Sequence, residues 1–483
     1  MKKTGHLTKT MQKAVSVMLA GALCMSTLAG CDKKPDTETT AAAATTAQAG
    51  ETTASPAESS AESTAAVTTP VATKAPTTAA PTQAPTTAAL ELKEGEIIEL
   101  DPFPEVKIPD TEAIRFVKNL EVGWNLGNTF DAYSGGTGLD LESAWVGIKT
   151  SQKLIQTVYD AGFRTVRIPV SWHGHMDAET QKIDEAWLNR VKEVVDWSLD
   201  AGLYVIINIH HDNEKNDKGL YLYPSYDELE NSKKYVTSVW SQVAEAFADY
   251  DERLVFETMN EPRQVGTDHE WWVAAASEVG KECIDCVNQL NQTCVDAIRA
   301  QGSEANRKRY ILVPGYCASP DFEVTAAFQL PTDAQALKEN LILLSVHAYR
   351  PYNFALAGES EKSSTDQFTI TKASDRRDID DFLKSVHAKF VLQGVGCVIT
   401  EYGARLKNDN DRARAEFAAY YVAAARNYGM TTVWWDNHVF SGSGEIFGLI
   451  NRRNCNILYP SIVDQLIYYS KPENAPVAEN KAA

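Results

Sequence analysis

Two glutamates, Glu261 and Glu401, each stand where an apolar, strand-like run of the sequence stops. Glu261 lies between an asparagine and Pro262, which ends strand pairing and turns the chain. Glu401 ends the run CVITE, 140 residues further along. Two convergent carboxyl groups are the minimum equipment for cleaving a glycosidic bond, because one protonates the leaving oxygen while the other attacks the anomeric carbon or activates water. The sequence therefore predicts a catalytic pair, provided that the fold brings the two runs together.

The elements that would position this pair alternate along the chain from about residue 96 onward. We predict strands at 122–128, 164–170, 204–210, 254–260, 309–315, 341–347, 396–402 and 431–437. We predict helices near 150–161, 184–202, 228–249, 270–300, 376–391, 411–428 and 461–470, with a poorly marked one at 332–340 after the fifth strand. Eight strand–helix units favour an α/β fold, the closed (β/α)8 TIM barrel. The alternative is an open doubly wound sheet, which would bind a nucleotide at a glycine-rich first turn.

Polar side chains stand at the ends of six of the eight predicted strands. In a (β/α)8 barrel the catalytic groups lie at the carboxyl ends of the strands, so these residues are expected to share one cleft. In chain order they are Arg167, His210, His211, Asn260, Glu261, His347, Tyr349, Glu401, Trp435 and Asn437.

The motifs around these residues resemble glycoside hydrolase family 5, the cellulases that carry both glutamates on the fourth and seventh strands. The matching segments are GWNLGNTFDA, RIPVSW, VIINIHHD, MNEPR, SVHAYRPYNFA, ITEYGA and WWDN, in this order. They span roughly residues 115–470. The set resembles the subfamily that contains many clostridial and rumen endoglucanases and xyloglucanases.

This resemblance implies a retaining mechanism in which Glu261 is the general acid/base and Glu401 is the nucleophile. It implies that Arg167 lies beside Glu401 and keeps it ionised. Tyr349 should donate a hydrogen bond to the nucleophile. Asn260 should bind the 2-hydroxyl group of the sugar.

The remaining substrate contacts also follow from the resemblance. His210 and His347 should contact the sugar in the −1 subsite, and Trp435 should stack beneath its ring. Further substrate-binding candidates are His211, Asn125 and Asn437.

Several residues near these motifs have a second interpretation. Glu257 lies four residues before Glu261, inside the strand, and is expected to form a buried ion pair rather than to catalyse. Trp434 and Trp435 are neighbours on one strand and therefore face opposite sides, with Trp434 expected in the core. The segment HHD at 210–212 suggests a metal, but no third ligand at metal spacing is evident, so we expect neither metal nor cofactor. Four further aromatic residues could be sugar platforms or packing: Tyr133, Trp145, Trp172 and Phe440.

The function predicted from these features is a retaining endo-β-1,4-glucanase that hydrolyses cellulose-like glucans. Xyloglucan, mixed-linkage glucan, mannan and xylan are alternative polymers, because loop shape decides among them. A non-catalytic glycan-binding barrel is a hypothesis of a different class, although binding alone needs no paired carboxylates. A metal-dependent hydrolase would need a cluster of His, Asp or Glu ligands.

The amino-terminal part of the chain predicts export. Residues 1–30 combine a basic start with a short apolar run and read as a signal peptide that ends in LAGC, which resembles a lipoprotein cleavage site with Cys31 as the lipidated residue. Residues 31–95 are rich in Thr, Ala and Pro, with no aromatic residue between Cys31 and Phe103, and are expected to be a disordered linker. The catalytic domain is predicted at 96–475 and a short tail at 476–483. We therefore expect an extracellular enzyme, anchored to the cell surface by its lipid or freely secreted.

Charge and cysteine content limit the partners. The formal net charge is −19, and it becomes −23 without the four lysines of residues 1–30. Such an acidic chain is a poor candidate for binding nucleic acid but is compatible with neutral glucan substrates and a monomeric state. Six cysteines follow the signal region, and buried free thiols are expected. The CIDC segment at 283–286 also allows a disulfide or a metal site, but its helical periodicity favours burial.

Overall fold

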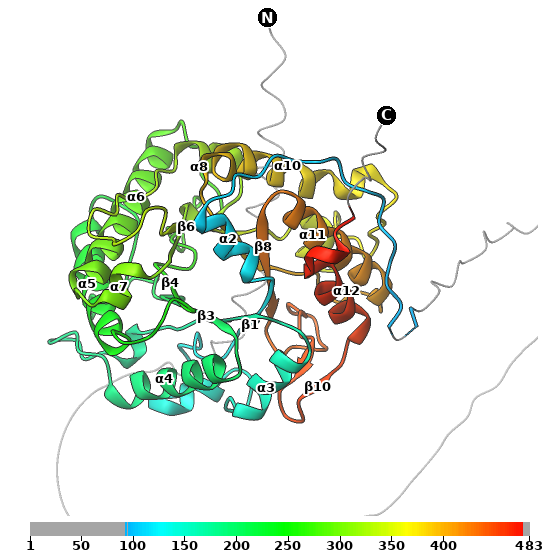
Figure 1. The fold of residues 1–483 in the computed structure, drawn as a ribbon. Coiled ribbons are helices and arrows are strands. Elements are labelled where there is room, and N and C mark those ends of the chain that lie inside the picture. The colour runs from blue at the N-terminus through cyan, green and yellow to red at the C-terminus, as the bar shows by residue number, and fades with distance from the viewer. Residues whose placement is uncertain (1–91, 94, 477–483) are drawn as a thin grey trace, which may run out of the picture. The chain divides into compact units, whose positions relative to one another are not determined.

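The computed structural model of the chain describes residues 92–93 and 95–476 (Figure 1). The predicted signal peptide, Cys31 and nearly all of the predicted linker lie outside the described residues, as does 477–483. Those domain boundaries therefore remain predictions. Within the described segments, every helix is too short or too polar to span a lipid bilayer.

Eight parallel strands form a closed barrel in which each strand pairs with the next and β8 pairs with β1. Their bounds are β1 Val122–Leu126, β2 Thr165–Ile168, β3 Tyr204–Asn208, β4 Leu254–Glu257, β5 Ile311–Pro314, β6 Ile342–His347, β7 Cys397–Tyr402 and β8 Met430–Asp436. The predicted TIM barrel is confirmed. The first four strands end two or three residues earlier than predicted, because the chain leaves the sheet where the polar side chains turn into the cleft.

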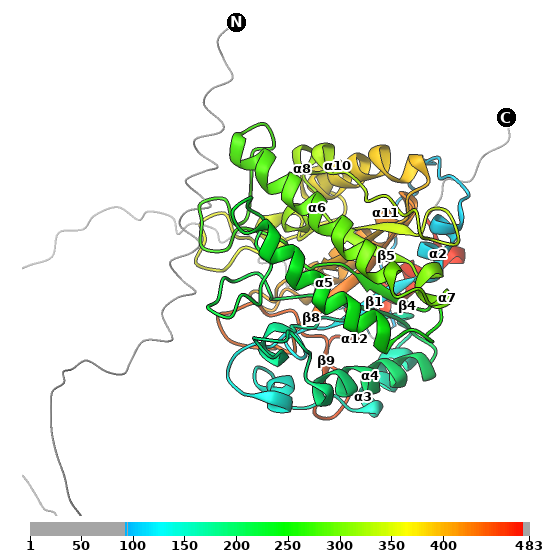
Figure 2. The same ribbon diagram turned by 90° about the vertical axis from the view of Figure 1, so that its left-hand side faces the viewer.

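The outer layer consists of helices that lie against the strands (Figure 2). The longer ones are α3 Gln152–Asp160, α4 Glu185–Asp200, α5 Leu229–Ala246, α6 Glu278–Ala300, α10 Ala373–Lys389, α11 Asp411–Asn427 and α12 Pro460–Ser470. Short elements are α7 Glu304–Lys308, α8 Phe322–Ala327, α9 Tyr352–Ala355, the antiparallel pair β9 Ile450–Asn451 and β10 Asn456–Ile457, and the 3-10 turns η2 Gly138–Ser143, η3 His173–His175, η4 Tyr316–Ala318, η5 Val391–Gln393 and η6 Pro472–Asn474. The long helices match the predicted ones, with ends that differ mostly by a few residues.

The predicted helix at 332–340 is wrong. This segment is irregular, with a turn at 334–335 and no helix, and the helix that follows β5 is the shorter α8. Polar residues of segment 332–340 bond to α6 and do not cap a helix of their own. Asp333 pairs with Arg299 at 2.7 Å, and Thr332 donates its backbone N–H to the side chain of Gln292. These contacts hold the segment as a loop.

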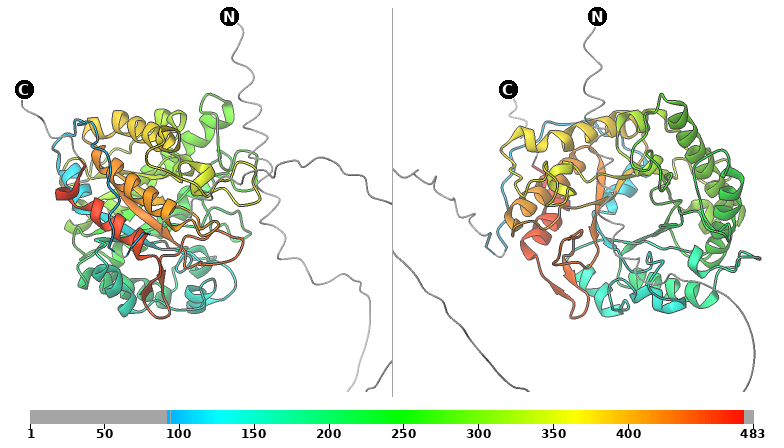
Figure 3. Two further views of the ribbon diagram at one scale, coloured as in Figure 1. Left: turned by 90° about the vertical axis from the view of Figure 1, so that its right-hand side faces the viewer. Right: turned by 180° about the vertical axis from the view of Figure 1, so that it is seen from behind.

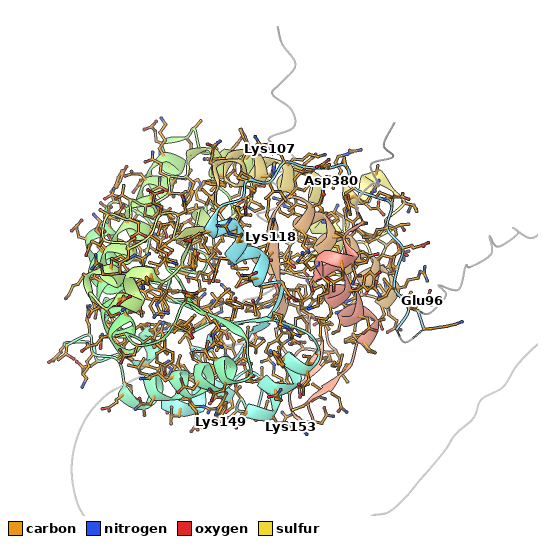
Figure 4. All side chains as sticks on the ribbon, viewed as in Figure 1. Glu96, Lys107, Lys118, Lys149, Lys153 and Asp380 are labelled. Carbon is orange, nitrogen blue, oxygen red and sulfur yellow. The ribbon has the colours of Figure 1, made fainter. Side chains whose placement is uncertain are left out.

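One further helix, α2 (Glu112–Asn119), closes the amino-terminal end of the barrel and lies at the centre of Figure 1. Its apolar face packs on the interior of the barrel through a cluster that includes Phe116, Val117, Val255, Leu343 and Val398. Lys118, labelled in Figure 4, lies on its exposed side. Because this end is plugged, the opposite end, seen from behind in Figure 3, is where a substrate can enter.

The six cysteines of the described part are free thiols, as predicted. Five are buried, and only Cys455 is partly exposed. Burial raises the pKa of Cys283 to about 11 and that of Cys286 to about 12. The CIDC segment therefore forms part of a helix packed against the barrel and carries no disulfide.

Arg309, between α7 and β5, is a fully buried cation that binds backbone carbonyl groups. Its Nη1 donates to the carbonyl oxygens of Asp251 and Leu254, and its Nη2 donates to those of Phe247 and Tyr250, at 2.6–3.2 Å. The guanidinium thus fixes the turn between α5 and β4. Because Glu261 follows β4, this contact also helps to hold the strand that positions Glu261.

We expect Arg309→Met to lower the free energy of unfolding by about 3 kcal/mol or more, because four carbonyl groups each lose one donor while Met keeps the volume. Urea unfolding followed by fluorescence measures the change. The control is Arg115→Met, because Arg115 forms an exposed pair with Asp110 that is worth less than about 1 kcal/mol. Equal stability of the two variants would contradict the role given to Arg309.

Candidate active site

A buried arginine at the carboxyl end of β2 connects the residues of the predicted cleft. Arg167 is fully buried and donates from Nη1 to Glu401 Oε1 at 2.7 Å and to Asn125 Oδ1 at 2.9 Å. Its Nη2 donates to Asn260 Oδ1 at 2.7 Å. Its Nε bonds to Glu257 Oε2 at 2.8 Å. The predicted contact of Arg167 with Glu401 and the predicted buried ion pair of Glu257 are therefore both confirmed.

Glu257 is held from several sides, which explains why it cannot serve as a catalytic acid. Besides Arg167, it accepts hydrogen bonds from Asn208 Nδ2 at 2.8 Å and from Ser345 Oγ at 2.7 Å. Its side chain is fully buried. Glu257 therefore balances the charge of the guanidinium.

The structure brings Glu261 and Glu401 together across the barrel mouth. His347 Nδ1 lies 2.8 Å from Glu261 Oε1 and 3.5 Å from Glu401 Oε2. These ligand-type atoms of the three residues all lie within 4.8 Å of one another. Tyr349 donates its hydroxyl to Glu401 Oε2 at 3.1 Å, and its raised pKa, caused by burial and by the charge of Glu401, keeps it a donor.

The charge of Glu261 raises the pKa of Glu401, because two ionised carboxyl groups repel at this separation. Burial raises the pKa of Glu261, but His347 and Arg263 outweigh it and lower that pKa to about 2 in the substrate-free cleft. Burial also raises the pKa of Glu401, against the opposing effect of His347 and Arg167. A change of charge beside either group must therefore alter the titration of both.

Asp131 lies next to His210 and His211, a contact that was not predicted from the sequence. Asp131, which follows β1, lies with both histidines in a group whose ligand atoms are within 4.8 Å of one another. No third ligand at metal spacing was evident in the sequence, because Asp131 is almost eighty residues away in the chain and comes close only through the barrel. The two carboxylate oxygens of Asp131 already accept the backbone N–H groups of Asn128 and Thr129.

The protonation of His210 nevertheless disfavours a metal. Val170 donates its backbone N–H to Asn208 Oδ1 at 3.0 Å, so Asn208 Nδ2 must donate to His210 Nδ1, 3.1 Å away. Burial lowers the pKa of His210 well below 6.5, so the ring is neutral and its proton is on Nε2. An Nε2–H group is a donor suited to a sugar hydroxyl and is not a metal ligand.

The side chains of the two remaining asparagine candidates form hydrogen bonds with backbone groups of the protein. Asn125 is fully buried, and its Nδ2 is close to three backbone carbonyl groups of β7 and β8. Asn437 donates to the carbonyl oxygen of Glu445 and accepts the N–H of Phe447, which fixes the loop after β8. Their geometry suits the positioning of other residues.

Trp435 lines the cleft side of β8, and Trp434 lies in the core, as predicted. Trp434 is fully buried and donates its Nε1–H to the carbonyl oxygen of Phe447. The Trp435 ring lies parallel to that of His210, with ring centroids 5.8 Å apart. A Cβ atom at Gly127 would lie 2.8 Å from the Trp435 ring, so only glycine leaves the indole this position.

A series of rings continues away from Trp435 and His210. His211 lies against His210, and Tyr133 and Trp145 lie 5.6 and 5.7 Å from His211 between ring centroids. Trp145 is 37% exposed, which suits a sugar platform. Trp172, in contrast, is buried and bonds to the carbonyl oxygen of Asn208, so it is packing. Phe440 is partly buried against Gly448.

No role was predicted from the sequence for Arg263 or Asn208. Arg263 ends the motif MNEPR and contacts Glu261. Its position two residues after a predicted catalytic glutamate could have indicated a role in the site. Asn208 lies two residues before His210 on the cleft-facing side of β3, and period-2 alternation could have indicated it.

The site combines two opposed carboxyl groups, a nucleophile candidate held by an arginine, and an aromatic floor at the mouth of a TIM barrel. These features are those of barrels that cleave glycosidic bonds. Residues 127–441 match the family model described as Cellulase (glycosyl hydrolase family 5), and the chain belongs to this family. The predicted family is thus confirmed, and the protein is a glycoside hydrolase.

Three relatives illustrate the similarity. Endoglucanase B of Neocallimastix patriciarum is 37% identical over 359 residues, which cover 73% of this chain and 70% of that protein. The solved structure of a family 5 lichenase from Caldicellulosiruptor sp. F32 is 45% identical, with a TM-score of 0.75, and the match covers 78% of this chain and 100% of the lichenase. A xyloglucan-specific endo-β-1,4-glucanase from a metagenomic library, in complex with cellotriose, is 32% identical with a TM-score of 0.66, covering 74% and 98%.

We expect Glu257→Gln to move both limbs of the pH profile of kcat/KM to lower pH by roughly one unit. The amide keeps the shape and can accept from Arg167 while donating to Ser345. One buried negative charge is lost, so both catalytic carboxyl groups ionise more easily. The matched control is Glu142→Gln, a buried glutamate paired with Arg190 outside the cleft, which should leave both limbs in place. Unchanged limbs in Glu257→Gln would contradict the electrostatic role of Glu257.

Proposed function

We propose that this protein is a retaining endo-β-1,4-glucanase that cleaves internal β-1,4 linkages of glucans by double displacement. The observation that carries the proposal is the proximity of Glu261 and Glu401, with carboxyl oxygens within 4.8 Å. Retaining enzymes hold their carboxyl groups about 5–5.5 Å apart, whereas inverting enzymes need about 6.5–9.5 Å for an intervening water.

In the first step Glu401 attacks the anomeric carbon and forms a glycosyl ester, while the bond to the leaving oxygen breaks and Glu261 supplies its proton. Arg167 and Tyr349 hold Glu401 at the attack position through both of its oxygens. In the second step Glu261 takes a proton from water, the water oxygen bonds to the anomeric carbon, and Glu401 leaves as a carboxylate. His347 lies between the two carboxyl groups and contacts both.

The sugar in the −1 subsite lies on Trp435 and is oriented by hydrogen bonds from His210 and Asn260. Arg167 occupies Asn260 Oδ1, so the Nδ2 group is available to donate to the 2-hydroxyl. Trp145 and Tyr133 extend the floor toward further sugar units. The names of the relatives support a glucan with β-1,4 linkages and also include a lichenase and a xyloglucan-specific enzyme, so mixed-linkage glucan and xyloglucan belong in the substrate panel.

We expect Glu401→Gln to lose nearly all turnover of a soluble glucan while keeping the fold, because the nucleophile is gone. In Glu261→Ala the loss on the glucan should be about 10²- to 10⁴-fold. Azide should then rescue Glu261→Ala on an activated aryl cellobioside and give a β-glycosyl azide, identified by NMR.

Glu401→Gln serves as the control, because azide should not yield the β-configured product without a glycosyl ester. Near-wild-type turnover of Glu401→Gln would overturn the assignment of the nucleophile. An α-configured first product from the wild-type enzyme would overturn the retaining mechanism.

We also propose that the protein is exported and attached to the outer face of a membrane through Cys31. The basic and apolar start of the chain, LAGC and the Thr/Ala/Pro-rich stretch support it. A single acyl chain binds membranes only marginally, whereas a lipoprotein with a diacylglyceryl group has several chains. The linker would then give the barrel reach toward an insoluble polymer.

We expect Cys31→Ser to abolish partitioning into detergent, either by releasing active enzyme or by leaving the precursor unprocessed. The measurement is detergent-phase partitioning after expression in a bacterium that processes lipoproteins, with the specific activity of the soluble barrel as the control. Native protein that stays wholly in the aqueous phase and begins at another residue would show that the enzyme is freely secreted.

A further inference from the structure

A buried carboxylate, Asp212, follows the two histidines at the end of β3. Its side chain is fully buried, and among the described residues His173 of η3 is the only basic side chain within ion-pair distance of it. His173 Nδ1 lies 2.5 Å from Asp212 Oδ1, which also accepts the backbone N–H of His173 at 2.8 Å. A buried carboxylate is costly unless it is paired and hydrogen-bonded, so this pair is a fixed part of the fold.

The contact with Asp212 determines which nitrogen of His173 can titrate. A carboxylate oxygen only accepts hydrogen bonds, so Nδ1 donates to Asp212 in both charge states of the ring. The nitrogen that gains or loses a proton is therefore Nε2. The His173 side chain is 21% exposed, so this proton can exchange with water. Protonation thus changes the charge of His173 while its bond to Asp212 is kept.

The same ring contacts the aromatic floor of the cleft. The ring centroids of His173 and Tyr133 lie 5.8 Å apart, with 50° between the ring planes. Tyr133 in turn lies edge-on to Trp145, with centroids 5.4 Å apart, and contacts His211. Burial and the charge of Glu214 raise the pKa of Tyr133, so its hydroxyl stays neutral. Tyr133 therefore connects His173 with the exposed ring of Trp145.

We propose that His173 is a positioning residue for Tyr133 and that its protonation strengthens the binding of longer glucan chains on the aromatic floor. The inference rests on the proposed function. A cation within about 6 Å of an aromatic centroid is attracted to the π system, whereas a neutral imidazole has no such attraction. The charged His173 ring therefore restrains Tyr133, and the neutral ring restrains it less. Chains whose sugar units reach Tyr133, beyond the unit on Trp435, sense this difference.

The charged groups around His173 set the direction of the effect. Burial lowers the pKa of His173, but the hydrogen bond and charge of Asp212 outweigh it, so the pKa is raised above 6.5. Glu214 adds to this rise, and Lys218 opposes it. His175, on the same turn, is neutral because burial lowers its pKa to about 4. The extra affinity for longer chains is therefore present at acidic pH and is lost as the pH rises through the raised pKa of His173.

The test uses the 4-nitrophenyl β-glycosides of cellobiose, cellotriose and cellotetraose, with kcat/KM measured for nitrophenol release. These substrates share one leaving group and differ only in the number of sugar units on the other side of the cleavage point. The ratio of kcat/KM between successive substrates therefore cancels the titration of Glu261 and Glu401. We expect one of the two ratios to fall about two- to fivefold between about pH 5.5 and about pH 8.5.

Two variants assign this change to His173 and Tyr133. His173→Asn places an amide donor where Nδ1 stands and carries no titrating group. Its ratio should be independent of pH and equal to the value that the wild type reaches at high pH. Tyr133→Ala should lower the same ratio and remove its pH dependence, because the ring that senses the charge is gone.

His387→Gln is the matched control. His387 lies on α10, away from the cleft, and bonds through Nε2 to the carbonyl oxygen of Lys107, a contact that the glutamine amide can replace. This variant loses a histidine but should keep the pH dependence of the wild type.

A pH dependence that survives in His173→Asn would assign the change to another group, such as His211, and would overturn the inference. If His173→Asn does not fold, NMR titration of the His173 ring in the wild type decides instead. The midpoint of that titration must coincide with the midpoint of the change in the ratio, and separate midpoints would also overturn the inference. A wild-type enzyme that releases nitrophenol from none of the three substrates would overturn the proposed function itself.

Discussion

The guanidinium of Arg167 is a cation without access to water, and the cleft is arranged around its N–H donors. Burying such a charge costs several kcal/mol unless it is paired and fully hydrogen-bonded. Glu257 and Glu401 supply the opposite charges, and Asn125 and Asn260 supply neutral acceptors. The fork of arginine meets four groups at fixed angles, which lysine could not do. The same hydrogen bonds of Arg167 therefore position the nucleophile and stabilise the fold.

Strand register supplies the partners of this cation. Asn125 is in register with Arg167 on β1 and β2, Asn208 with Glu257 on β3 and β4, and His347 with Glu401 on β6 and β7. Parallel pairing puts the members of each pair side by side, so these three pairs bring six polar side chains to the same end of the barrel. The register shifts around Val346 and His347 and between Ile399 and Tyr402 lie beside the third pair, where the sheet adjusts to aim His347 and Glu401.

The sequence predicted the eight strands well, because each is a short apolar run and six of them end in a polar group. Glu257 could be recognised as buried because it lies inside the strand, four residues before Glu261. Asp131 escaped prediction, since its approach to His210 depends on closure of the barrel and on no local pattern. The prediction of a helix at 332–340 was wrong because bonds from this segment to α6 outweighed its weak helical periodicity. Contacts between distant elements are what a single sequence leaves open.

The free thiols of the barrel have a consequence for how the enzyme can be made. Cys294 and Cys397 are buried and their pKa values are raised by that burial, so little thiolate is available for oxidation or alkylation. No cross-link joins the cysteines of residues 95–476, so the fold needs no oxidising catalyst and no isomerase. Among the described cysteines only Cys455 is partly exposed, so the five buried thiols leave the folding of this barrel independent of the redox state of its surroundings.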